Sequence, residues 1–200
     1  MRKYALSIML APVAALLLFV GATSALGSRS DDIDRVWTAA TATEADQIAD
    51  VLWQTMHARA VAARTFDVSG IVANVVDDPA VPLTQQQTAT LSRINPAAAP
   101  KGQLTAELAF YARWKQGDAA FTRVQSARRL GVAADPTDLA AAMPKRSDPI
   151  YDLPLIVHSV VISGDRAYME AETGPVYYRV TLVHRGNRWF IAGENNTSRN

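Results

Sequence analysis

The last third of the chain alternates short β-branched and aromatic runs with tight turns, and this pattern restricts the fold more than any other feature. We expect strands over residues 155–162, 166–173, 176–184 and 188–194. Each connection is only a few residues long and contains a glycine: Gly164, Gly174 or Gly186. Strands joined by such short turns must be antiparallel to their neighbours, so the sequence predicts a β-meander.

Two of these turns define the register independently. With Gly174-Pro175 as one turn, Met169 faces Val180, and with Gly186-Asn187 as the next, Leu182 faces Ile191. Both turns place the same largely apolar set on one face, and a shift of one residue would expose it. The set is Ala167, Met169, Ala171, Tyr178, Val180, Leu182, His184, Trp189 and Ile191. The sequence does not decide the register of the first hairpin, between residues 155–162 and 166–173.

The same register predicts an ionic ladder on the opposite face. Glu170 would face Arg179, and Arg179 would face Glu194, with aromatic residues around them. Aromatic residues and an arginine in one patch are typical of a protein–protein interface; the alternative is a solvated sheet face with cross-strand pairs. The interface candidates are Tyr168, Glu170, Tyr177, Arg179, Phe190 and Glu194.

Before residue 150, apolar residues recur at helical spacing. We expect a helix from the capping box at Thr43 to about residue 66, and further helices over 84–94, 104–115 and 119–130. Gly117-Asp118 is expected to interrupt the last two. Residues 66–78 could form a helix or a strand, and 137–143 one helical turn. The predicted fold is α+β, with N-terminal helices packed on a curved antiparallel meander that forms a cone.

The N-terminus resembles a membrane-targeting segment. Arg2 and Lys3 precede an uncharged, apolar stretch over residues 4–26. This is the pattern of a signal peptide or of a single transmembrane anchor, and both alternatives remain open for residues 1–28. The basic residues before it and the acids after it place the body outside the cytoplasm. The body would be anchored on the cell membrane, or secreted or periplasmic if the segment is cleaved. Residues 29–42 are expected to be a linker or stalk helix, 43–195 the domain and 196–200 a tail.

Composition argues against several function classes. The formal net charge of +1 argues against nucleic-acid binding. The chain has no cysteine, which excludes disulfides, cysteine zinc sites and thiol catalysis. We find no phosphate-binding loop, dinucleotide fingerprint, nucleophile elbow or metal-ligand spacing. We therefore expect no cofactor, no metal ligand and no catalytic residue.

The predicted strands also resemble a known family. Gly164-Asp165-Arg166-Ala167 leads from a turn into a strand, and His184-Arg185 ends one before Trp189 opens the last. These features resemble the closing strands of nuclear transport factor 2-like domains, the SnoaL-like or cystatin-like cones. The superfamily contains enzymes, ligand binders and non-catalytic assembly modules, so the resemblance does not choose a function. It implies that an enzyme would carry a carboxylate or an Asp–His pair inside the cone. The predicted register places His184 there as the only candidate acid–base side chain.

The leading hypothesis is a non-catalytic, extracytoplasmic interaction module in a membrane-associated assembly. Its partners would be membrane-associated proteins, or a second copy bound through the sheet face. Residues 4–26 would attach it to the membrane. The alternative is a small-ligand binder or SnoaL-like cyclase or isomerase. Its pocket candidates at the cone mouth are Tyr111, Trp114, Tyr178, His184 and Trp189. A basic helical stretch, from Arg113 to Arg129, is either a solvated face or a contact for an acidic partner or anionic lipid headgroups.

Overall fold

The computed structural model describes residues 36–146 and 154–198. The predicted hydrophobic segment, the first part of the predicted linker and the end of the predicted tail lie outside the described residues. Among the residues described, no helix combines the length and the apolar character needed to cross a bilayer.

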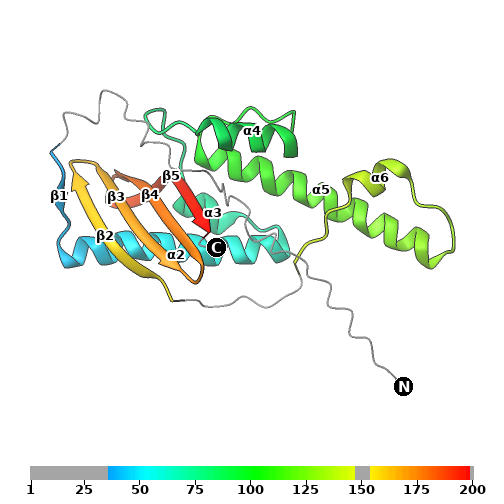
Figure 1. Cartoon of the computed structure of the whole chain (residues 1–200), viewed down its shortest axis with the longest axis horizontal. Coiled ribbons are helices and arrows are strands. Elements are labelled where there is room, and N and C mark those ends of the chain that lie inside the picture. Colours follow the sequence, from blue (N-terminus) through cyan, green and yellow to red (C-terminus); the bar gives the residue numbers. More distant parts are fainter. Residues whose placement is uncertain (1–35, 147–153, 199–200) are drawn as a thin grey trace, which may run out of the picture.

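The strands form one antiparallel sheet in sequence order (Figure 1). They are β1 (Thr38–Ala39), β2 (Ile156–Ser163), β3 (Arg166–Thr173), β4 (Val176–Arg185) and β5 (Arg188–Ser198). The predicted meander is confirmed. Thr38 and Ala39 pair with β2, so they form a strand where a linker or stalk helix was expected. At the other end, β5 continues to Ser198 opposite Val176, so residues 196–198 belong to the sheet.

The register is confirmed between β3 and β4 but changes within the last hairpin. Met169 lies opposite Val180, and Leu182 opposite Ile191, as predicted. In the β4–β5 hairpin, directly after the Leu182–Ile191 pair, a bulge at Ala192 adds one residue to β5, and the side chains beyond it change face. Arg179 therefore lies opposite Asn195, and the predicted Arg179–Glu194 pair is wrong.

Five helices lie in the described part of the chain. They are α2 (Ala42–Thr65), α3 (Ser69–Asn74), α4 (Gln85–Ile94), α5 (Gln103–Arg129) and α6 (Pro136–Ala141). The cap of α2 is Thr41, two residues before the expected Thr43. The Thr41 hydroxyl accepts from the Glu44 N–H at 3.3 Å, and the Glu44 carboxylate accepts from the Thr41 N–H at 2.9 Å.

The predicted interruption at Gly117 is wrong, because α5 is one continuous helix. Gly117 is buried where the chain after α6 crosses the helix, and its carbonyl accepts from the Met143 N–H at 2.9 Å. A Cβ at this position would lie 2.5 Å from the Met143 Cβ. Gly117 therefore permits a close approach between two segments.

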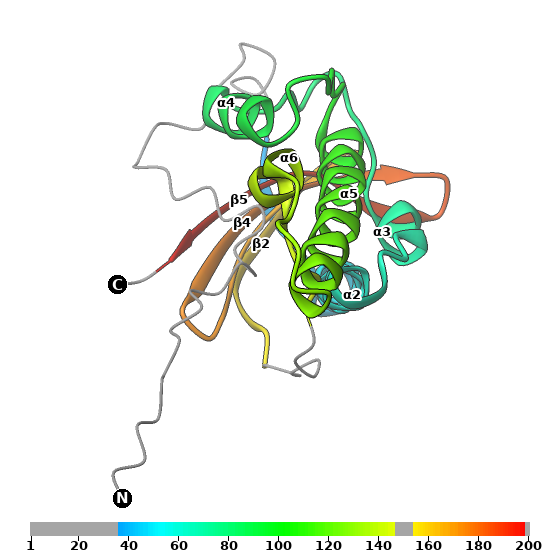
Figure 2. The ribbon, with the colours of Figure 1, turned by 90° about the vertical axis from the view of Figure 1, so that its right-hand side faces the viewer.

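Helices α2 and α5 lie on one face of the sheet and enclose the core with it (Figure 2). The largest side chains buried there come from both layers. They are Ile48, Leu52, Ile71, Trp114, Met169, Leu182 and Ile191. In the described part of the chain, no helix covers the other face, which we call the outer face. This arrangement confirms the α+β class.

Candidate functional site

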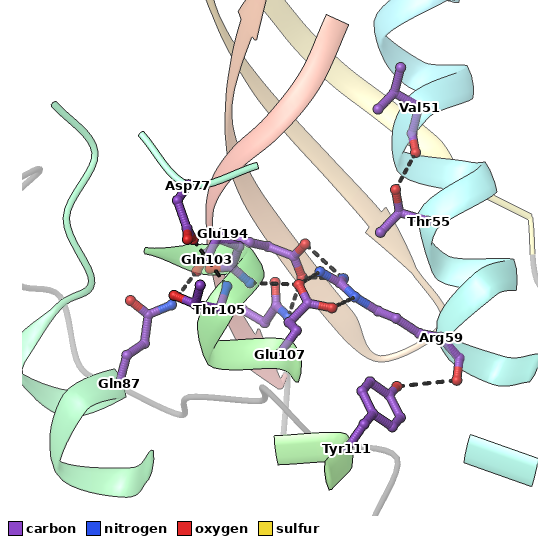
Figure 3. A network of polar contacts seen from close by, with 11 residues as sticks. Val51, Thr55, Arg59, Asp77, Gln87, Gln103, Thr105, Glu107, Tyr111 and Glu194 are labelled. Atoms are coloured by element: carbon purple, nitrogen blue, oxygen red, sulfur yellow. Dashed lines mark hydrogen bonds and ion pairs between the residues drawn. The ribbon is translucent and has the colours of Figure 1, made fainter. Parts of the chain in front are cut away.

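A charged cluster lies in the interior, between the helices and β5 (Figure 3). Arg59 comes from α2, Glu107 from α5 and Glu194 from β5. We call these three residues, with the amides of Gln103 and Asn196, the Arg59 network. Glu194 belongs to it because the bulge at Ala192 turns its side chain from the outer face to the inner one.

The Arg59 guanidinium bridges both carboxylates. Its Nε donates to Glu107 Oε2 at 2.9 Å, and its Nη1 donates to the two Glu194 carboxylate oxygens at 3.0 and 2.8 Å. The side chains of Glu107 and Glu194 are 0% and 1% exposed, and that of Arg59 is 17% exposed. This charge-assisted bridge ties both helices to the sheet.

Amide groups supply further donors. Gln103 Nε2 donates to Glu107 Oε1 at 2.9 Å, and Asn196 Nδ2 donates to Glu194 Oε1 at 2.7 Å. Such hydrogen bonds offset part of the cost of burying two carboxylates. Gln103 is 1% exposed, and among the described residues its Oε1 has no hydrogen-bond partner.

The electrostatics of the network favour the ion pairs. Burial alone would lower the pKa of Arg59, but the charges and hydrogen bonds of Glu107 and Glu194 raise it well above its ordinary value. Burial and the charge of Glu194, opposed by Arg59, raise the pKa of Tyr178 to about 12. Burial and the charge of Glu107 likewise raise the pKa of Tyr111. Because Arg59 occupies both carboxylates, neither is placed as a free general base.

The expectation that only His184 could titrate on the inner face is therefore wrong. Glu194 lies on the inner face, whereas His184 is exposed beside Trp189, with their ring centroids 4.9 Å apart. Trp189 is buried as expected, at 7% exposure. The signal that could have revealed Glu194 is Gly193, since an isolated glycine within a strand indicates a bulge.

The pocket candidates do not line one site. Tyr111 and Trp114 are buried in an aromatic cluster, where the Trp114 Nε1–H donates to the Pro144 carbonyl at 3.0 Å. Tyr178 pairs with Asn196 near one end of the β4–β5 ladder, and Trp189 pairs with His184 near the other. Tyr178 and Trp189, the candidates that lie on strands β4 and β5, are therefore separated along the sheet.

On the outer face, Glu170 and Arg179 lie opposite each other on β3 and β4, as predicted. Arg179 Nε is 3.4 Å from Glu170 Oε1, and the two side chains are 48% and 30% exposed. The guanidinium also lies 5.9 Å from the centre of the Tyr177 ring. Burial and the charge of Glu170 raise the pKa of Tyr168 to about 12. We call Tyr168, Glu170, Tyr177 and Arg179 the outer-face patch.

The two remaining interface candidates lie apart from this patch. Glu194 is inside, and Phe190 is covered by Arg188, whose guanidinium carbon is 4.7 Å from the ring centre. The chain between α3 and α4 crosses the outer face at Val81, which would contact a Cβ at Gly193. Because Gly193 lies between Phe190 and the β5 residues opposite the patch, this crossing separates Phe190 from the patch.

His158 occupies a second bulge, in β2, next to the outer-face patch. Its Nε2 is 3.3 Å from Glu172 Oε2, and its ring stacks on Tyr177 with centroids 5.7 Å apart. The patch thus continues into a histidine and a further carboxylate. In the described residues no group of three or more His, Cys, Asp or Glu side chains could hold a metal ion.

Comparison with known proteins gives no family, no curated protein and no solved structure that matches this chain.

Proposed function

We propose that this chain is a membrane-tethered, extracytoplasmic interaction module that binds a partner protein through its outer-face patch, as a subunit of a membrane-associated assembly. The observation that carries the proposal is that the two faces of the sheet have different surroundings. The helices pack on one face, while Tyr168, Tyr177 and the Glu170–Arg179 pair lie on the other. Tyrosine and arginine are the residue types that dominate binding energy at interfaces.

The tether in this proposal rests on charge asymmetry in the sequence. Arg2 and Lys3 precede the apolar stretch over residues 4–26, and Asp31, Asp32 and Asp34 follow it. Positive charge before such a stretch favours a cytoplasmic N-terminus, with the body on the other side. The family resemblance in the strands supports a nuclear transport factor 2-like cone for that body.

The interior supports a non-catalytic role. The carboxylates of Glu107 and Glu194 are bound by Arg59, and Trp114 is buried with its indole N–H bonded to the Pro144 carbonyl. An enzyme of this class needs an open cavity with a polar group that reaches the substrate. In the Arg59 network the charged groups satisfy one another instead.

The test is Arg179→Ala, compared with Arg123→Ala as the matched control. Arg123 also forms an exposed pair, with Asp138 on α6. At a desolvated interface, loss of Arg179 would leave Glu170 buried and unpaired, at a cost of about 2–5 kcal/mol of association. On a solvated surface, the change would cost less than about 1 kcal/mol.

We therefore expect Arg179→Ala to dissociate the detergent-solubilised native complex, measured by its size on native gels, while the melting temperature stays close to that of the unchanged protein. Arg123→Ala should leave the complex intact. Survival of the complex with Arg179→Ala at ordinary salt would refute the interface.

One observation favours a second candidate, a small-ligand binder or SnoaL-like cyclase or isomerase. Gln103 Oε1 is a buried acceptor without a partner among the described residues, and Glu107 connects the same amide to Arg59, whose side chain is 17% exposed. A ligand with a hydroxyl or amine donor would satisfy it. Thermal stabilisation by such ligands, lost in Gln103→Leu, would support this candidate.

A further inference from the structure

The C-terminal half of α5 extends away from the sheet, with α6 packed along it (Figure 1). The helix ends because Gly131 adopts a φ of +69°, which favours glycine, and its N–H donates to the Arg128 carbonyl at 3.2 Å. This ending leaves two apolar side chains in water: Leu130 is 77% exposed and Val132 is 57% exposed. We call Arg128, Arg129, Leu130 and Val132 the α5 tip.

The segment of chain that contains the α5 tip is basic. Residues 113–146 contain seven basic and three acidic residues, a formal net charge of +4, although the whole chain carries only +1. The basic residues are Arg113, Lys115, Arg123, Arg128, Arg129, Lys145 and Arg146. Arg128 and Arg129 belong to the tip, and Arg123 lies two turns of α5 before Leu130, whereas the other four lie nearer Gly117. Of the acids, Asp138 already pairs with Arg123 at the start of α6. Arg128 and Arg129 are exposed and adjacent to the apolar residues.

We propose that the α5 tip docks on the surface of an anionic lipid bilayer. Exposed apolar side chains flanked by arginines fit the boundary between acyl chains and negatively charged headgroups. The tip has two apolar side chains and no aromatic residue, a smaller contact than a stable protein interface needs. Its two arginines add electrostatic attraction to an anionic surface, which complements the small apolar contact. The charge complementarity is independent of the outer-face patch. The inference rests on the proposed tether only to bring a bilayer within reach.

The absence of native cysteine allows a direct test on the full chain. Val132→Cys, labelled with an environment-sensitive fluorophore, reports on the tip, and Asn187→Cys, in the exposed β4–β5 turn, is the control. Each labelled chain is reconstituted into vesicles of phosphatidylcholine alone or of phosphatidylcholine mixed with phosphatidylglycerol. Flotation of the chain with the neutral vesicles reports separately on the tether.

We expect a blue shift at position 132 in anionic vesicles, absent in neutral vesicles and at position 187. Each arginine near an anionic surface contributes roughly five-fold to the docking equilibrium, so Arg128→Gln with Arg129→Gln should weaken that equilibrium about 25-fold, measured from how the shift depends on the fraction of phosphatidylglycerol. High salt should do the same.

A chain that floats with neutral vesicles but shows no shift in anionic ones would overturn the tip proposal and leave the tether intact. An equal shift in both vesicle types would also overturn it, because the tip would then be buried against protein or neutral lipid. A chain that fails to float would contradict the tether, while an anionic-specific shift at position 132 would still support the tip.

Discussion

Replacing Arg59 with methionine should destabilise the folded chain by about 3–5 kcal/mol, the usual cost of removing one partner from a buried ion pair. Methionine keeps the apolar stem of the side chain but ends where the guanidinium begins. Glu107 and Glu194, with side chains 0% and 1% exposed, would then be buried without their counter-charge.

The remaining donors cannot replace the guanidinium. Arg59 bonds the Glu107 carboxylate through Nε and Nη2, and both Glu194 oxygens through Nη1. After the substitution each carboxylate keeps one amide donor, from Gln103 or Asn196. Unfolding would then release two desolvated carboxylates into water, which lowers the free energy of unfolding.

The assay is urea unfolding of the full chain in mild detergent at neutral pH, followed by tryptophan fluorescence. Arg123→Met is the matched control, because it removes the same group from a pair whose arginine side chain is 60% exposed. That change should cost less than about 1 kcal/mol. Equal small losses for both variants would refute the reasoning, since water would then reach the Arg59 network and the ligand-binding candidate would gain support.

Other consequences concern packing and pH. Trp189→Ala should cost about 3–5 kcal/mol in the same assay, as expected for a large core side chain, and a loss below about 1 kcal/mol would contradict its burial. Gly117→Leu should cost about 1–3 kcal/mol and increase amide exchange in α6, because its Cβ would meet Met143; unchanged exchange would contradict the close packing. Burial holds the pKa of Tyr178 at about 12 in the fold, above its ordinary value near 10. Its stabilisation should therefore be complete below pH ~10 and lost as the pH rises toward about 12, a decline that Tyr178→Phe should reduce in urea titrations; an unchanged decline would refute this assignment.

The central register was predictable because a short turn fixes it. Gly174-Pro175 leaves two residues between β3 and β4, so a single pairing register is possible. That register places Met169 and Val180 on the same buried face. The bulge at Ala192 was not taken into account, and its effect reaches only the residues beyond it. That single extra residue moved Glu194 from the outer face into the Arg59 network.

Three features of the helices and of the site differ from what the local sequence indicates, each for its own reason. Glycine ordinarily weakens a helix, yet Gly117 lies within α5 because Met143 packs against it. The cap of α2 was predicted at Thr43 because Asp46 follows at capping-box spacing. Thr41 forms the cap because Glu44, at the same spacing from it, bonds back to its N–H. The long-range contact of Arg59 with Glu107 has no local signature at all.

Site-specific photocrosslinking from the outer face tests the central claim most directly. A benzophenone amino acid replaces Tyr177, and the same group at Gln54, an exposed residue on α2, serves as the control. The proposed interface predicts a discrete adduct in intact cells from position 177, absent from position 54 and lost when Arg179→Ala is added. No adduct from position 177, or one that persists without Arg179, would contradict the claim that the outer-face patch binds a partner protein.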